Sequence, residues 1–284
     1  MQWKSCELSD NDVQDQATPL TLDDVIRLRR WKKGVQFGIF AVLIGLVLWS
    51  VQATVIDDTD WQRIGTLADI GESVGHFIGI DFALIPSLLG PTIETFMIAC
   101  IGTLLGLVFC IPMIWFGALN VTPFKPVTYP IARVAMTLSR SIHEIVWALI
   151  FVSAVGLGAF AGILAIAARS LGFIAKMSAE AIENIDHRPV EAIRAMGGSN
   201  LQVMIYAILP QVLPVILGIV IFEWEINIRR SSVLGLVGAG GLGLVFFRQM
   251  NTFNYPGVTT VIIAILMLIL IGEVVSHYSR KALI

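Results

Sequence analysis

Ionisable side chains interrupt two strongly apolar segments of this chain. In the first segment, Arg140, His143 and Glu144 stand at i, i+3 and i+4, which places them on one face of a helix and allows an Arg140–Glu144 ion pair. The second group lines one stripe of a later segment and comprises Glu223, Asn227 and Arg230. Glu225 precedes Arg229 by four residues and offers it an ion pair of the same kind.

The arginines of these groups have two interpretations. A guanidinium group matches the geometry of a phosphorus oxyanion, so Arg140 or the Arg229–Arg230 pair is a candidate contact for such an anion. Alternatively, the groups pair with one another and only fix helix packing, as ionisable residues in membrane segments commonly do. Arg169, in another apolar segment, has no acidic residue three or four positions away, so its partner must come from another helix or from water.

The composition predicts a membrane protein. Of the 284 residues, 56% are hydrophobic and 14% are charged, which is too apolar for an ordinary soluble domain. A spanning helix needs roughly 20 largely apolar residues. Six segments meet that need and predict an all-α membrane protein: 35–54, 88–116, 130–155, 158–181, 202–228 and 258–277. An even number of spans places both termini on the same side of the membrane.

Charge distribution predicts which side that is. Segment 1–34, expected to be a polar tail followed by a basic amphipathic stretch, carries five Lys and Arg residues between Arg27 and Lys33, whereas the loop 55–87 after the first span is mainly acidic. Cytoplasmic flanks carry the excess of Lys and Arg, so we expect both termini in the cytoplasm and 55–87 outside. The five further spans then belong to 88–284, with the Glu223–Arg230 group toward the outer end of the fifth.

A short polar helix is predicted at 189–197, between two apolar spans on the cytoplasmic side. Pro189 suits a first helical turn, and Gly197 suits the left-handed residue just after a helix end. Ser199 and Gln202 form the pattern of a capping box, which starts the next helix at a sharp corner. A polar helix in this position faces a partner protein rather than lipid.

A glycine-rich run follows the fifth span and includes Gly235, Gly238, Gly240, Gly241 and Gly243. Part of it satisfies G-x-G-x-x-G, but a dinucleotide site also needs a preceding strand and an acidic residue about 20 positions later, and Thr259 and Thr260 stand there. We therefore expect close helix packing, or irregular backbone that lines a cavity or gate.

No residue pattern indicates chemistry in this chain itself. Cys100 and Cys110 lie on one predicted helix about 15 Å apart, too far for a disulfide, and the histidines are scattered without metal-ligand spacing. No P-loop of the G-x-x-x-x-G-K-[ST] type is present. We expect no catalytic residue, no bound metal or other cofactor and no nucleic-acid partner.

The polar helix and its surroundings resemble the "EAA" coupling loop of permease subunits in ATP-binding-cassette importers. The resemblance rests on Glu191, on Gly197 six positions later, and on Leu209-Pro210 in the following helix; Ile193 and Ala207 depart from the pattern. Three stretches are most similar to the phosphonate (phosphonate, phosphite or hypophosphite) transport branch: 141–149, 155–158 and 209–212.

The resemblance implies a type I importer permease fold in a bacterial inner membrane. It also implies a homodimer, two cytoplasmic ATPase subunits that bind ATP and magnesium, and an external protein that delivers a phosphonate or a reduced phosphorus oxyanion. This chain is then not an enzyme, and its ATPase-coupling residues are Glu191, Ala192, Arg194, Ala195, Gly197 and Pro210. Gly197 is expected to let the corner pack closely.

Three other functions remain open. A methionine or quaternary-amine importer has the same architecture and a different cargo. A secondary transporter requires inverted repeats and works without ATPase subunits, but no internal repeat is evident. An intramembrane hydrolase requires a paired acid, base or metal, for which His143 and Glu144 alone are thin support.

Overall fold

The computed structural model describes residues 22–56 and 67–283, and all regular structure in those ranges is helical. The chain divides into two compact units, Met1–Ile70 and Gly71–Ile284, which are described separately. The tail predicted at 1–20 lies outside the described residues.

The first unit contains α1 (Leu22–Val51), which continues into a π-helical turn, η1 (Gln52–Ile56). The part from Arg29 to Ile56 is long and apolar enough to cross a membrane, and it includes the first predicted span. Large apolar side chains such as Phe37, Leu48 and Trp49 are exposed along it. A helix that is apolar all round is typical of a membrane segment.

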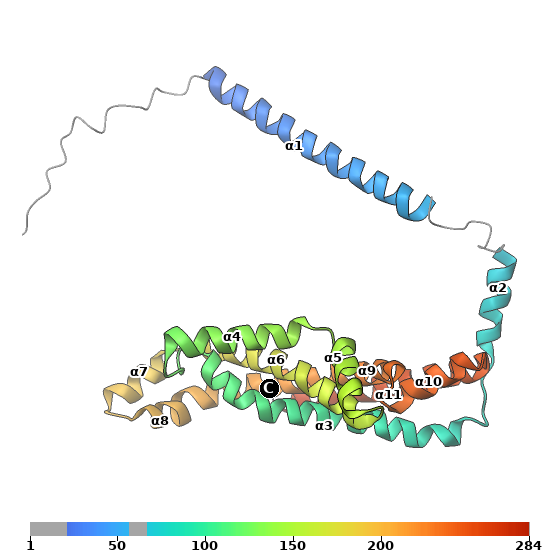
Figure 1. The fold of residues 1–284 in the computed structure, drawn as a ribbon. Coiled ribbons are helices and arrows are strands. Elements are labelled where there is room, and N and C mark those ends of the chain that lie inside the picture. The colour runs from blue at the N-terminus through green and yellow to red at the C-terminus, as the bar shows by residue number, and fades with distance from the viewer. Residues whose placement is uncertain (1–21, 57–66, 284) are drawn as a thin grey trace, which may run out of the picture. The chain divides into compact units, whose positions relative to one another are not determined.

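The boundary between the units falls within α2 (Leu67–Gly75), and the second unit is a helical bundle (Figure 1). Its elements follow in the order α2 (Leu67–Gly75), η2 (His76–Ile78), α3 (Ile85–Gly117), α4 (Lys125–Ser141), α5 (Glu144–Val155), α6 (Ala159–Glu183), α7 (Arg188–Ala195), α8 (Asn200–Val203), η3 (Met204–Ile208), α9 (Leu209–Leu234), η4 (Gly235–Val237), α10 (Gly241–Asn251) and α11 (Tyr255–Leu283). The segment predicted as the outer loop therefore contains α2 and η2.

The helix α6 forms the centre of the bundle and contacts α3, α4, α5 and α9. Small side chains permit this close packing: a Cβ added at Gly102 of α3 would lie 2.8 Å from Ile166, and one added at Gly172 of α6 would lie 2.6 Å from the Met136 carbonyl oxygen. Interfaces between membrane helices favour small residues for this reason.

Five helices of the described residues are long and apolar enough to span a membrane, and the bent pair α4–α5 makes a sixth when it counts as one span. The prediction of a continuous third span over 130–155 is wrong, because α4 and α5 meet at 91°. Ile142 and His143 have extended backbone there, and the His143 side chain caps α5 by accepting from the Ile145 N–H. The break matters because charged residues flank it.

The fifth span is longer than predicted. A nearly continuous helix runs from Asn200 to Val237, 38 residues, which corresponds to about 57 Å and exceeds the ~30 Å hydrocarbon core. The π-helical turn η3 ends two residues before Pro210, which has no N–H for the carbonyl four residues earlier. The wider turn lets the helix continue through this proline.

Candidate functional site

The short helix α7 is anchored on one side and exposed on the other. Val190 is buried, and Ile193 packs against the same apolar cluster, which includes Ile182, Val203 and Ile208. The predicted coupling residues on α7 are exposed: Glu191, Ala192, Arg194 and Ala195. Figure 1 shows α7 and α8 together at one end of the bundle. This arrangement offers a polar surface to a partner while the helix stays fixed to the core.

A Schellman motif ends α7. Gly198 N–H donates to the Ile193 carbonyl oxygen at 2.9 Å, Gly197 N–H donates to the Arg194 carbonyl oxygen at 3.0 Å, and Gly197 has a φ of +80°. The prediction of a left-handed glycine at Gly197 is confirmed. The prediction that Gly197 lets the corner pack closely is wrong, because nothing lies within 4 Å of a Cβ added there. Gly198 makes the close approach instead, because an added Cβ would lie 2.5 Å from Ile193 Cγ2.

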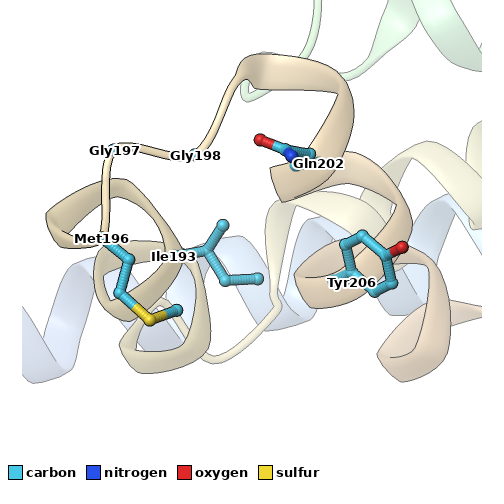
Figure 2. Close-up of a pocket in the computed structure, with 6 residues that line it drawn as sticks. All are labelled: Ile193, Met196, Gly197, Gly198, Gln202 and Tyr206. Atoms are coloured by element: carbon cyan, nitrogen blue, oxygen red, sulfur yellow. The ribbon is translucent and has the colours of Figure 1, made fainter.

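The predicted capping box is confirmed: Ser199 accepts from the Gln202 N–H at 3.4 Å, and the Gln202 side chain accepts from the Ser199 N–H at 2.7 Å. An open pocket of about 400 Å³ lies between α7 and the helix that follows it. Figure 2 shows Ile193 of α7 and Tyr206 of η3 on its two sides, below the Gly197–Gly198 turn. The pocket is large enough to receive a side chain of a partner.

A glutamine ties this corner to α9. Gln211 donates to the Asp186 carbonyl oxygen at 3.3 Å and to that of Ala207 at 2.7 Å, and it accepts from the Asp186 N–H at 3.1 Å. It directly follows Pro210, the predicted coupling residue at the start of α9, which is exposed. The sequence analysis did not include Gln211 in the predicted site. Its position directly after Leu209-Pro210 was the feature of the sequence that could have indicated it.

An arginine joins the helix ends around the same corner. Arg133 of α4 donates to the Gly117 carbonyl oxygen at 2.9 Å, where α3 ends, and its guanidinium pairs with Glu183, where α6 ends, at 2.7 Å. Glu183 also accepts from the Leu119 N–H. The sequence analysis missed Arg133, because its partners are about 16 and 50 residues away and leave no local pattern.

The first intramembrane group is arranged differently from the prediction. Arg140, His143 and Glu144 do not share a helical face, because Arg140 belongs to α4 and Glu144 to α5. The expected Arg140–Glu144 ion pair is therefore wrong: the Arg140 guanidinium lies over the Phe173 ring, 6.0 Å from its centroid. His143 is largely exposed, with its Nδ1 3.8 Å from Glu144.

Arg169 takes the place that was predicted for Arg140. Its Nε donates to Glu144 at 3.0 Å, and its Nη1 donates to the Arg140 carbonyl oxygen at 2.9 Å. Of the two expected sources of a partner for Arg169, another helix or water, the structure shows another helix. One side chain of α6 thus connects the last turn of α4 to the first turn of α5, across the break.

The charge network continues into α9. Arg230 lies 3.7 Å from Glu144 and 2.6 Å from Glu223, and it donates to Asn227 at 3.0 Å. Ser170 donates to Glu223, and Asn227 donates to Ser170 and to Thr103 of α3. Glu223 and Asn227 are fully buried. The predicted stripe of Glu223, Asn227 and Arg230 therefore joins α3, α5, α6 and α9.

Glu225 belongs to a separate pair. It accepts from Arg229 at 2.9 Å, as predicted, and its other oxygen accepts from Ser276 and Arg280 of α11. Arg280 lies in the last turn of α11. This contact places the Glu225 pair beside the end of α11, and its expected position toward the outer end of the pathway stays a prediction.

The predicted glycines lie at close helix contacts around the α9–α10 turn. A Cβ added at Gly235 would lie 2.6 Å from the Gly243 Cα. Gly238, Gly240 and Gly241 have φ values of +88°, +82° and +70°, which glycine adopts without strain. The carbonyl oxygen of Gly238 also accepts from the Gly158 N–H at 2.9 Å, which links this turn to the start of α6.

Residues 107–283 match the family described as binding-protein-dependent transport system inner membrane component. The chain belongs to this family. It is a multi-pass membrane permease whose matched region begins within α3 and includes the charge network, the α7 corner and the glycine-rich turn.

Two relatives support a narrower branch. The phosphite transport system permease protein PtxC of Stutzerimonas stutzeri is 36% identical over 249 residues, which are 87% of the permease and 89% of PtxC. The phosphate-import permease protein PhnE of Mycolicibacterium smegmatis is 31% identical over 254 residues, 88% of the permease but only 46% of PhnE. The permease is thus a member of the phosphonate-type branch, as the sequence resemblance indicated.

A solved structure supports the fold. The permease resembles a chain of the MetNI methionine ABC transporter in an inward-facing conformation, with a TM-score of 0.63 and 22% identity over 72% of the permease and all of that chain. At this identity the likeness concerns the fold alone. The predicted all-α importer permease fold is confirmed.

Proposed function

We propose that the permease forms the membrane pathway of an ATP-driven importer for a phosphonate or a reduced phosphorus oxyanion such as phosphite or hypophosphite. The names of its relatives support this substrate class, since phosphite and phosphate are both phosphorus oxyanions. An external binding protein delivers the anion. Two cytoplasmic ATPase subunits bind ATP and magnesium, and a homodimer of the permease carries no catalytic residue.

The topology of this proposal places both termini and the α7 corner in the cytoplasm of a bacterium. Residues 1–34 then form a cytoplasmic segment, 35–54 the first span, 55–87 an external segment, and 88–284 the permease domain. The basic residues before the first span and Arg280 with Lys281 at the end of α11 support this orientation.

One observation carries the coupling role: α7 exposes Glu191 and Arg194, while Val190 of the same short helix is buried in the core. Such a helix binds a partner and moves as one body with the bundle. Glu191, Ala192, Arg194 and Ala195 contact the ATPase, Gly197 forms the turn that ends the helix, and Pro210 begins α9 beside it.

The mechanism is alternating access. ATP closes the two ATPase subunits, which displaces α7, and Gln211 transmits the displacement to α9 while Arg133 transmits it to α3, α4 and α6. The glycine-rich turn with Gly235, Gly238, Gly240, Gly241 and Gly243 changes its packing as a gate. Hydrolysis and release reverse the movement. Of the intramembrane candidates, Glu223, Asn227, Arg229 and Arg230 already bind protein groups, so they serve first to hold the helices.

The test is purification of the tagged permease in mild detergent with its subunits, followed by reconstitution and assay of ATP hydrolysis with the loaded binding protein. We expect an ATPase to co-purify and phosphite or an alkylphosphonate to stimulate hydrolysis and uptake. Stimulation by methionine or glycine betaine instead identifies the alternative importer class. If an intact preparation contains no ATPase, the importer function is wrong and a secondary transporter becomes the better reading.

A further inference from the structure

Two cations in the helices α4 and α6 have no acidic partner among the described residues. The carboxylate that was predicted to pair with Arg140 belongs to Glu144, and Arg169 and Arg230 occupy it. Arg140 is half-buried, and no carboxylate of the described residues lies within ion-pair distance of its guanidinium. Its neighbour is the Phe173 ring, and a cation–π contact contributes only about 0.5–2 kcal/mol.

Lys176 is the second such cation, and the sequence analysis did not consider it. It stands three residues after Phe173 on α6, so the two side chains share a helical face with Arg169. Lys176 is also half-buried, and none of the ion pairs between described residues includes it. Glu180, one turn further, lies 3.5 Å from Arg133 instead.

The position of these cations calls for a polar neighbour. Both lie in helices of the predicted spans, and α4 runs along α6 where they meet (Figure 1). A charged side chain at membrane depth faces a water-filled cavity or a protein group, not lipid tails. Arg140 over the Phe173 ring and Lys176 one turn further along α6 therefore need a negative charge from outside the described chain.

We propose that Arg140 and Lys176 form a binding site for a phosphorus oxyanion, on the side of the charge network that leads to α7. Arg140 supplies the forked donor and Lys176 a point charge, while the positive edge of the Phe173 ring suits the same anion. This inference rests on the proposed substrate class and names its site. Glu180, one turn closer to the corner, limits how tightly the anion is held, so that it can leave toward the cytoplasm.

The site predicts a transport defect in a complex whose ATP hydrolysis still responds to the loaded binding protein. In the reconstituted importer, Arg140→Gln and Lys176→Gln should each lower phosphite uptake per ATP hydrolysed about tenfold, because each removes one charge-assisted hydrogen bond to the anion. Lys176→Arg should keep most of the uptake. Lys125→Gln, an exposed cation at the start of α4, is the matched control and should behave as the unchanged protein.

Vesicle composition separates two sources of the anion. The assay is done in phosphatidylcholine alone and in phosphatidylcholine with phosphatidylglycerol. Equal defects in both support a site for the transported anion, whereas a defect confined to the second shows that the cations bind the anionic lipid and overturns the inference. Normal uptake by both Gln variants also overturns it and leaves the importer function standing. If the unchanged protein couples ATP hydrolysis to its binding protein but moves no phosphorus oxyanion, the proposed substrate class is wrong and this inference falls with it.

Discussion

Arg169 on α6 and Glu144 on α5 form an ion pair of 3.0 Å beside the 91° break between α4 and α5. Both side chains are largely buried, and the same arginine also binds the Arg140 carbonyl oxygen at the end of α4. Arg169 therefore donates to a carbonyl oxygen at the end of α4 that has no hydrogen-bond partner within its own helix. The bend of this span depends on a residue from another helix.

Loss of Arg169 should destabilise the permease strongly. Arg169→Gln leaves the largely buried Glu144 carboxylate with Arg230 at 3.7 Å and His143 at 3.8 Å, and removal of one partner of a buried ion pair costs about 3–5 kcal/mol. The measurement is the melting temperature in detergent. Arg229→Gln is the control, since that side chain is 45% exposed and its ion pair contributes at most about 1 kcal/mol. Equal shifts for the two variants contradict the assignment.

The two glycines after α7 should respond differently to substitution. Gly198→Ala places a Cβ 2.8 Å from the Ile193 carbonyl oxygen, so the turn must rearrange and uptake should be lost. Gly197→Asn should keep uptake, because asparagine tolerates a positive φ, whereas Gly197→Val should cost about 1–3 kcal/mol in backbone strain. Uptake and membrane insertion are measured together. Normal uptake by Gly198→Ala contradicts the close approach.

Charge reversal on α7 should prevent binding of the ATPase subunits without destabilising the permease. Glu191→Lys changes an exposed side chain, so the free energy of unfolding should change by less than about 0.5 kcal/mol, while the ATPase subunits no longer co-purify. Lys281→Glu at the end of α11 reverses an exposed charge away from this surface and is the control. Full recovery of the ATPase with Glu191→Lys excludes that carboxylate from the interface.

The Gln211 tie should affect coupling more than assembly. Gln211→Met removes its hydrogen bonds to Asp186 and Ala207 with little change in volume, each worth about 1 kcal/mol. ATPase subunits should still bind, but uptake per ATP hydrolysed should fall. Gln249→Met on α10 is the control, because it makes the same substitution in a different element. It should leave uptake per ATP hydrolysed unchanged. An unaltered ratio of uptake to hydrolysis rules out transmission through Gln211.

Alanine substitutions should lower the stability of the permease at a closely packed glycine but not at an open one. Gly243→Ala places a Cβ 2.8 Å from the Gly235 Cα, and overpacking of this kind costs about 1–3 kcal/mol. Gly218→Ala on α9 meets nothing within 4 Å and should be neutral or stabilise the helix by up to about 1 kcal/mol. The measurement is thermal unfolding of both variants in the same detergent. Equal melting temperatures for the two variants contradict the close packing at Gly243.

Local features of the chain were predictable from the sequence, because they depend on neighbouring residues. Hydropathy identified the apolar helices, and Pro189, Gly197 and the Ser199–Gln202 pair marked the corner around α7, since caps act within one turn. The Glu225–Arg229 pair was predictable for the same reason, as its members lie four residues apart on one helix.

Partner choice over long distances was decided by the tertiary structure alone. Arg140 and Glu144 stand at ideal helical spacing, yet the chain breaks between them, and Arg169, 25 residues away, takes the carboxylate. The same applies to Arg133 with Glu183 and to Gly235 with Gly243, whose contacts arise only when separate segments pack. Helical periodicity describes neighbours within one helix. Which helix supplies a buried charge with its partner depends on the packing of the whole bundle.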